Sequence, residues 1–172
     1  MIRLDSLILL AIPWIIYRVV VLVVKKQISI KNELIKVLFY FSVTFIYSLT
    51  LFPFPFYDYP NMESGGINLT PFESIYNLLT HSNFMYTLRN IVGNILLFMP
   101  LGFSIPLRFK VNKFWKVIIF GFFTSCLVEV IQLLTSIRSF DVDDLILNTL
   151  GAIIGFVLFR LFDKVRPLTK TN

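Results

Sequence analysis

The sequence has little of the chemistry from which disulfides and many metal centres are built. Its 172 residues include one cysteine, Cys126, and one histidine, His81. A single cysteine excludes an intramolecular disulfide, and the same scarcity excludes a metal site made of several cysteine or histidine ligands. Charged residues are also few, at 15% of the chain, against about a quarter in soluble domains. These shortages argue against a separate soluble domain.

Apolar residues are abundant instead, at 56% of the chain, and five apolar runs are long enough to cross a membrane at about 20 residues per crossing. The sequence therefore predicts an all-α fold, a polytopic transmembrane helical bundle of about five spans that forms a single integral membrane domain over residues 1–172. The first run has no signal-peptide cleavage site, so we expect it to be retained. The predicted spans are Leu4–Val24, Leu34–Phe52, Asn90–Leu107, Val117–Ile137 and Leu145–Phe162.

Basic residues gather on one side of the predicted bundle. Three clusters of four follow the first, third and fifth spans, whereas Arg3, Arg89 and Arg138 fall on the other side and Arg18 lies inside the first span. The positive-inside rule then puts the N-terminus outside and the C-terminus in the cytoplasm. Because the clusters flank apolar runs, the net charge of +6 does not indicate a nucleic-acid partner. The clusters are Lys25, Lys26, Lys31 and Lys36; Arg108, Lys110, Lys113 and Lys116; and Arg160, Lys164, Arg166 and Lys170.

The long outer connection from Pro53 to Arg89 contains no lysine and includes one predicted helix. Thr70-Pro71-Phe72-Glu73 has the spacing of a capping box, with proline at the first helical position. We expect a short helix from there to about Leu79, lying in the membrane interface. Its predicted apolar face consists of Phe72, Ile75, Tyr76 and Leu79.

Polar residues recur near the outer ends of three predicted spans. Glu129 lies inside the fourth run, where a carboxylate in hydrocarbon costs several kcal/mol unless it is paired, hydrated or protonated. At 1.5 Å per residue, Glu129 would lie about 13 Å below the outer end of its helix. Asn90 is expected at the outer rim of the third span. The residues predicted to share one polar cavity open to the outer face are Asn90, Asn94, Glu129, Gln132, Arg138, Asp141, Asp144 and Asn148.

Several of these positions also have purely structural interpretations. Asn94 and Gln132 are residue types that form hydrogen bonds between membrane helices. Arg138 and Asp141 are also consistent with an exposed ion pair that contributes little stability. Asp143 is expected to face solvent. Glu129 is the residue for which a functional interpretation is favoured.

The same residues lie in stretches that resemble the VanZ-like family of bacterial membrane proteins. The stretches are Asn68–Phe72, Asn90–Gly102, Glu129–Gln132 and Arg138–Gly151, and they cover about residues 66–156. The first two spans carry no signature of this kind. The resemblance implies a multi-pass protein of the bacterial plasma membrane. It also implies a role in lowering susceptibility to teicoplanin, a glycopeptide antibiotic that carries a lipid chain.

Three classes of function remain open. In the favoured one, the protein is not an enzyme, and its outward cavity binds the lipoglycopeptide or a lipid-linked wall precursor. In the second, Glu129, Asp141 and Asp144 are catalytic or hold Mg²⁺ or Ca²⁺, and a membrane-embedded enzyme acts on a lipid or wall precursor. In the third, Glu129 is the proton relay of a small transporter. The chain lacks a Ser-His-Asp set and inverted repeats, and no cofactor is required by the sequence.

Two kinds of partner are expected besides a ligand. Membrane lipid surrounds a bundle of this composition. Gly151 and Gly155 form a small-residue motif of the kind that packs membrane helices closely, so it is a candidate surface for a helix–helix oligomer.

Overall fold

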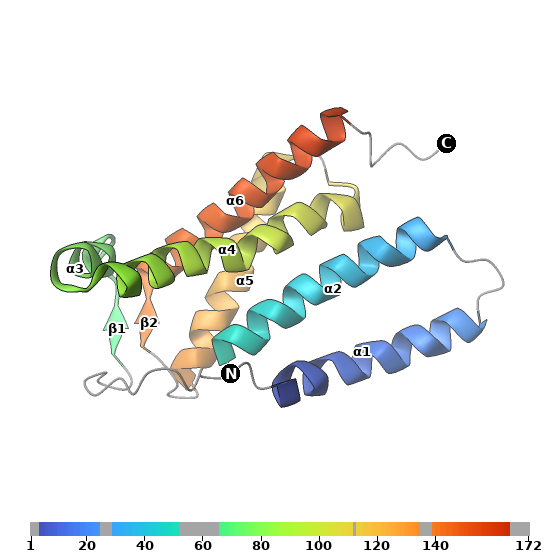
Figure 1. Ribbon diagram of the computed structural model, residues 1–172, viewed down its shortest axis with the longest axis horizontal. Coiled ribbons are helices and arrows are strands. Elements are labelled where there is room, and N and C mark those ends of the chain that lie inside the picture. The colour runs from blue at the N-terminus through green and yellow to red at the C-terminus, as the bar shows by residue number, and fades with distance from the viewer. Residues whose placement is uncertain (1–3, 25–28, 52–65, 112, 135–138, 166–172) are drawn as a thin grey trace.

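The computed structural model describes residues 4–24, 29–51, 66–111, 113–134 and 139–165, and almost all of them are helical (Figure 1). The predicted all-α membrane bundle is confirmed, and the only strands among the described residues are two short ones. The elements in chain order are α1 (Leu4–Val24), α2 (Ile30–Leu51), β1 (Ile67–Asn68), α3 (Glu73–His81), α4 (Phe84–Phe109), α5 (Phe114–Leu134), β2 (Phe140–Asp141) and α6 (Val142–Val165).

Four of these helices are long and apolar enough to cross a membrane, and the chain is a membrane protein. They correspond to the second to fifth predicted spans. The helix α1 has the predicted bounds, and within the described residues its apolar part is shorter, Ala11–Val21. The four spans are Ile30–Thr50, Phe84–Phe109, Phe114–Leu134 and Val142–Val165.

The helix α4 begins six residues earlier than predicted. Asn83 precedes its first residue, and the Asn83 side chain accepts a hydrogen bond from the Tyr86 backbone N–H at 2.8 Å. An asparagine cap satisfies one of the free N–H groups at the start of a helix, so the helix begins there and not at the apolar run. Asn90 therefore lies in the second turn of α4.

The helices α4 and α6 pack against each other without intervening side chains at three places. A Cβ atom added to Gly102 would overlap the backbone of Ala152, and one added to Gly151 would overlap the carbonyl of Ile95. Gly155 is equally close to Met99. Close backbone approach of this kind requires glycine. Gly151 and Gly155, the small-residue motif of α6, thus pack against α4 within one chain.

The two ends of the bundle differ in chemistry. Figure 1 shows α3 and both strands near the end where α4 and α6 begin, and we call this the strand end. At the opposite end, which we call the basic end, α1 and α4 finish and α2 and α5 begin. Basic residues that lie at this end include Lys31, Lys36, Arg108, Lys110, Lys113, Lys116, Arg160 and Lys164.

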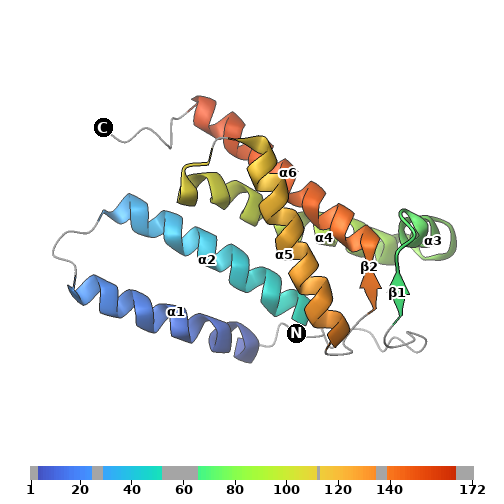
Figure 2. The same ribbon diagram turned by 180° about the vertical axis from the view of Figure 1, so that it is seen from behind.

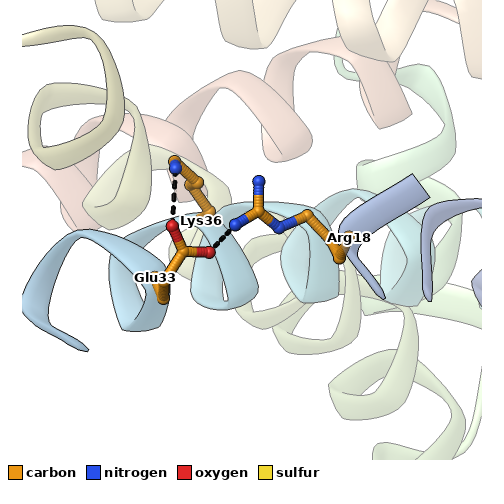
Figure 3. A network of polar contacts seen from close by, with 3 residues as sticks. All are labelled: Arg18, Glu33 and Lys36. Carbon is orange, nitrogen blue, oxygen red and sulfur yellow. Dashed lines mark hydrogen bonds and ion pairs between the residues drawn. The ribbon is translucent and has the colours of Figure 1, made fainter. Parts of the chain in front are cut away.

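One buried ion pair joins α1 to α2 near the basic end. Arg18 of α1, which is 8% exposed, forms an ion pair with Glu33 in the first turn of α2. Figure 3 shows both side chains pointing toward each other, with Lys36 on the other Glu33 oxygen at 2.8 Å. Because a charge in an apolar environment is stable only with a partner, this pair explains how α1 accommodates an arginine inside its span.

Candidate functional site at the strand end of the bundle

The outer connection is attached to the start of α6 by a pair of short parallel strands. Ile67 pairs with Phe140, and Asn68 pairs with Asp141. The Phe140 backbone N–H also donates to the Gly66 carbonyl at 3.0 Å. The two strands lie side by side in Figure 1, so residues separated by more than seventy positions in the sequence meet at this end of the bundle.

Asp141 is the centre of the polar contacts around these strands. Its carboxylate accepts a hydrogen bond from the Ser74 hydroxyl at 2.5 Å and one from the Asn68 amide at 3.4 Å. It also accepts from the Asp143 backbone N–H at 2.9 Å, in the first turn of α6. An aspartate immediately before a helix that accepts from the second helical N–H is an N-cap. Asp141 therefore caps α6 and holds the segment before α3 with one carboxylate.

Asp143 is buried, with 1% of its surface exposed, and the expectation that it faces solvent is wrong. Its carboxylate oxygens accept from the backbone N–H of Phe72 at 2.6 Å and of Ile75 at 3.0 Å. A carboxylate beside free N–H groups at a helix start is stabilised by hydrogen bonding and by the helix dipole. Asp143 thus binds the N-terminus of α3 from a different helix.

This contact also replaces the predicted capping box. The cap position of α3 is Phe72, which has a left-handed backbone with φ of 67°, and no side chain of the α3 segment caps the helix. The Thr70 backbone N–H donates instead to the Asn68 side chain at 2.9 Å, forming a turn before the helix. The helix was predicted correctly within two residues at its end, but its cap comes from α6.

Glu129 is 2% exposed. The described part of α5 runs to Leu134, and Arg138, from which the predicted depth of about 13 Å was counted, lies outside the described residues. The Glu129 carboxylate accepts a hydrogen bond from the Asp141 backbone N–H at 3.1 Å. Glu129 is therefore enclosed by protein at the strand end and supports β2, and it does not stand alone in hydrocarbon.

Three of the predicted polar residues form hydrogen bonds between spanning helices. Each joins a different pair of helices: Asn94 donates to Asp144 at 2.5 Å, Gln132 to the Thr50 carbonyl at 2.7 Å and Asn148 to the Ser125 hydroxyl at 2.9 Å. The Thr50 carbonyl belongs to the last turn of α2, where carbonyls have no partner within the helix. Gln132 and Asn148 are both buried, at 2% exposed.

A pocket of 270 Å³ lies between α3 and the first turns of α4 and α6. Three predicted site residues, Asn90, Asp141 and Asp144, line it, and Asn90 also donates to the Tyr86 carbonyl at 3.0 Å. Asn94, Glu129, Gln132 and Asn148 are not among its lining residues. The full lining consists of Ser74, Ile75, Asn77, Leu78, His81, Ser82, Tyr86, Asn90, Asp141, Asp143, Asp144 and Leu147.

The predicted cation ligands do not form a cluster. In the part of the chain that the structure describes, no group of three or more His, Cys, Asp or Glu side chains is arranged to hold a metal ion. The carboxylates of Glu129, Asp141 and Asp144 each accept hydrogen bonds from protein groups instead. Arg138, the remaining predicted site residue, lies outside the described residues.

Sequence reasoning overlooked Asn68 and Ser74 as parts of this site. Both side chains bind Asp141, although they precede it by 73 and 67 residues. Asn68 belongs to the first of the stretches that carry the family resemblance, and this membership could have identified it as a site residue. No local pattern marks Ser74.

The apolar face of α3 is turned outward beside the pocket. Phe72, Tyr76 and Leu79 are each more than 60% exposed, whereas Ile75 is half-buried against the bundle. Exposed aromatic and aliphatic side chains on one face of a short helix are typical of an interfacial helix. The helix that Asp143 binds is thus also the element best suited to contact lipid headgroups.

Together, fold and site define a polytopic helical membrane protein with a carboxylate-rich polar cluster at one end of the bundle. The family model VanZ/LLP1 matches residues 37–163, and the chain belongs to this family. The match includes most of α2, in which the sequence showed no signature. The chain is also 30% identical over 104 residues to Protein VanZ of Enterococcus faecium. That match spans 60% of this chain and 58% of the relative. No solved structure matches.

Proposed function

We propose that this protein lowers the susceptibility of a bacterial cell to teicoplanin-like lipoglycopeptides, acting at the outer leaflet of the plasma membrane. Membership of the VanZ/LLP1 family and similarity to Protein VanZ support this reading. The observation that carries it is the pocket beside α3, which combines polar walls with an adjacent apolar face at the end of the bundle.

The strand end faces outward in this proposal. Basic residues are retained on the cytoplasmic side of membrane proteins, and those that flank α2, α4, α5 and α6 lie at the basic end. The N-terminus is then outside and the C-terminus cytoplasmic. The pocket opens on the side from which a glycopeptide reaches its target.

The ligand is a molecule anchored in the outer leaflet by a lipid chain. Such a chain partitions into the membrane at about 0.8 kcal/mol per buried CH₂ and holds the polar part at headgroup level. There it meets the pocket wall, where Asn77, His81 and Asn90 offer hydrogen-bonding groups and Asp144 a carboxylate. The drug and a lipid-linked wall precursor both have this form. When the protein binds either the drug or the precursor, it keeps teicoplanin from docking productively on the precursor. The effect of teicoplanin is then reduced.

The carboxylates have different tasks in this mechanism. Asp143 and Glu129 hold α3 and β2 in place, since both are at least 98% buried and accept backbone N–H bonds. Asp144 and Asn90 are half-buried and form the pocket wall. Substitutions of Asp143 and Glu129 are expected to change the shape of the site. Substitutions of Asp144 and Asn90 are expected to change its affinity for the lipid-anchored ligand.

A membrane-embedded enzyme is the second candidate, and no observation on the described residues favours it. A cation-dependent reaction would draw support from several carboxylates converging on one point, but these carboxylates are distributed among separate hydrogen bonds. The first function is therefore preferred.

Expression in a susceptible Gram-positive host tests the proposal. The inhibitory concentration of teicoplanin should rise, and that of vancomycin, which has no lipid chain, should change much less. An equal rise for both drugs would indicate a changed wall precursor or a thicker wall, and would overturn the proposal.

A further inference from the structure

A second, chemically different site lies between α2 and α5. It is an apolar groove of 620 Å³, a size within the range of small-molecule sites. Figure 2 shows α2 and α5 approaching each other toward their carboxyl ends and diverging toward their amino ends. The bond from Gln132 to the Thr50 carbonyl joins them where they converge. The groove therefore opens toward the basic end, away from the pocket beside α3.

The groove is lined mainly by apolar side chains. Phe39, Ile119, Phe120 and Phe123 supply rings and an aliphatic chain, and the Thr124 hydroxyl donates within its own helix to the Phe120 carbonyl at 2.8 Å. The lining also includes the hydroxyls of Tyr40 and Tyr47 and the ammonium group of Lys116, so its polar groups are few and the rest of the surface is apolar. Hydrocarbon is the chemistry that such a lining fits.

The length of the groove matches one acyl chain of a lipid. Its α5 wall runs from Trp115 to Leu127, which is twelve residues or about 18 Å. The hydrocarbon core of a bilayer is about 30 Å thick, so one leaflet supplies about 15 Å. The length of the groove therefore matches that of an acyl chain in one leaflet.

The positive charge of Lys116 at the open end of the groove favours a lipid with an anionic headgroup. Lys116 is the basic residue of the lining, and its Nζ lies 5.6 Å from the centre of the Trp115 ring. Lysine and tryptophan at the end of an apolar surface are placed as anchors at the headgroup level. We propose that the groove binds one acyl chain of an anionic phospholipid in the leaflet at the basic end, with the phosphate of that lipid beside Lys116.

This site is independent of the drug-related function, because none of the residues that line it lines the pocket beside α3. Trp115 provides a probe within the groove. The chain has two tryptophans, Trp14 and Trp115, so the Trp14→Phe variant leaves Trp115 as the single tryptophan, which is excited selectively over tyrosine. The full chain is reconstituted in phosphatidylcholine bilayers, and brominated phosphatidylglycerol or brominated phosphatidylcholine is titrated in to quench it.

Phosphatidylglycerol should compete for the Trp115 site about fivefold better than phosphatidylcholine, since one lysine near an anionic surface contributes about 1 kcal/mol. Lys116→Gln should reduce this ratio toward one. Lys110→Gln removes the same charge from the same end of the bundle at a residue outside the groove, and it should keep the ratio. Equal quenching by the two lipids in the Trp14→Phe parent, or equal losses in Lys110→Gln and Lys116→Gln, would overturn the proposal.

Native mass spectrometry of the purified chain provides a second measurement. The wild type should retain one phosphatidylglycerol, and Val43→Phe, which places a ring in the groove, should release it without unfolding the protein. Retention of the lipid by Val43→Phe would place it elsewhere. A dimer that Val43→Phe dissociates would assign the groove to a second copy of the chain, and the lipid proposal would be wrong.

Discussion

The Asp143 carboxylate accepts a hydrogen bond from the backbone N–H of Ile75 at 3.0 Å, across 68 residues of sequence. A residue in the first turn of α6 thereby caps α3, a helix of the outer connection. The apolar face of α3 and the wall of the pocket both depend on where this helix lies, so one buried carboxylate determines the geometry of both.

We first predict that Asp143→Ala releases α3. The variant loses two charge-assisted hydrogen bonds to N–H groups, each contributing about 1.5–3 kcal/mol. Hydrogen exchange of residues 66–81 should become much faster, while α4 and α6 exchange as before. Glu73→Ala removes an exposed carboxylate from the same helix and is the matched control. If both variants exchange alike, Asp143 does not hold α3.

The second prediction concerns the contact between α4 and α6. Gly151→Ala puts a Cβ atom into the carbonyl of Ile95, so the helices must separate, and overpacking of this kind typically costs about 1–3 kcal/mol. Gly93→Ala makes the same change where no atom lies within 4 Å. Thermal unfolding in detergent should show a lower midpoint for Gly151→Ala and a wild-type midpoint, or a higher one, for Gly93→Ala. Similar midpoints in the two variants would contradict the close packing.

The positions and types of the helices were predictable, because they follow from local apolar runs. Helix ends were less so: Asn83 starts α4 through a side-chain cap that the apolar pattern does not contain. The contacts of the site were the least predictable. The pairing of Asn68 with Asp141 arises from β1 and β2, which are two residues each and have no periodic pattern. Asp143 looked solvent-exposed because its sequence neighbours are polar, but its partner is a distant helix end.

A third prediction tests orientation in the membrane. In a Cys126→Ser background, Glu73→Cys should react with a membrane-impermeant maleimide in intact cells, and Lys31→Cys should react only after lysis. Both positions are exposed, so burial does not limit either reaction. Labelling of Lys31→Cys in intact cells would reverse the topology and move the pocket to the cytoplasmic side.

Fourth, Glu129→Gln should abolish protection against teicoplanin while membrane abundance stays near wild type. Glutamine has nearly the same shape and can still accept the Asp141 N–H bond, but it has no charge to stabilise that end of the bundle. Inhibitory concentrations and immunoblots of membrane fractions measure the two effects. Full protection by Glu129→Gln would make Glu129 purely structural.

The last prediction tests whether the pocket itself, and not only the fold that supports it, is responsible for protection against teicoplanin. Asp144 lines the pocket and accepts from Asn94, and asparagine at this position keeps an accepting oxygen while it removes the charge. Asp144→Asn should therefore leave the fold and membrane abundance unchanged and still lose most of the protection against teicoplanin.

Glu73→Gln removes one exposed carboxylate from the same end of the molecule, at a residue outside the pocket lining. If general surface charge were responsible for protection, the two variants would lose it equally, because the change in net charge is the same. If the pocket is responsible, only Asp144→Asn loses it, and the ratio of teicoplanin to vancomycin inhibitory concentrations falls to that of cells without the protein. A wild-type ratio in Asp144→Asn would separate the resistance from this pocket, because the variant changes little else that the strand end presents to the outer leaflet.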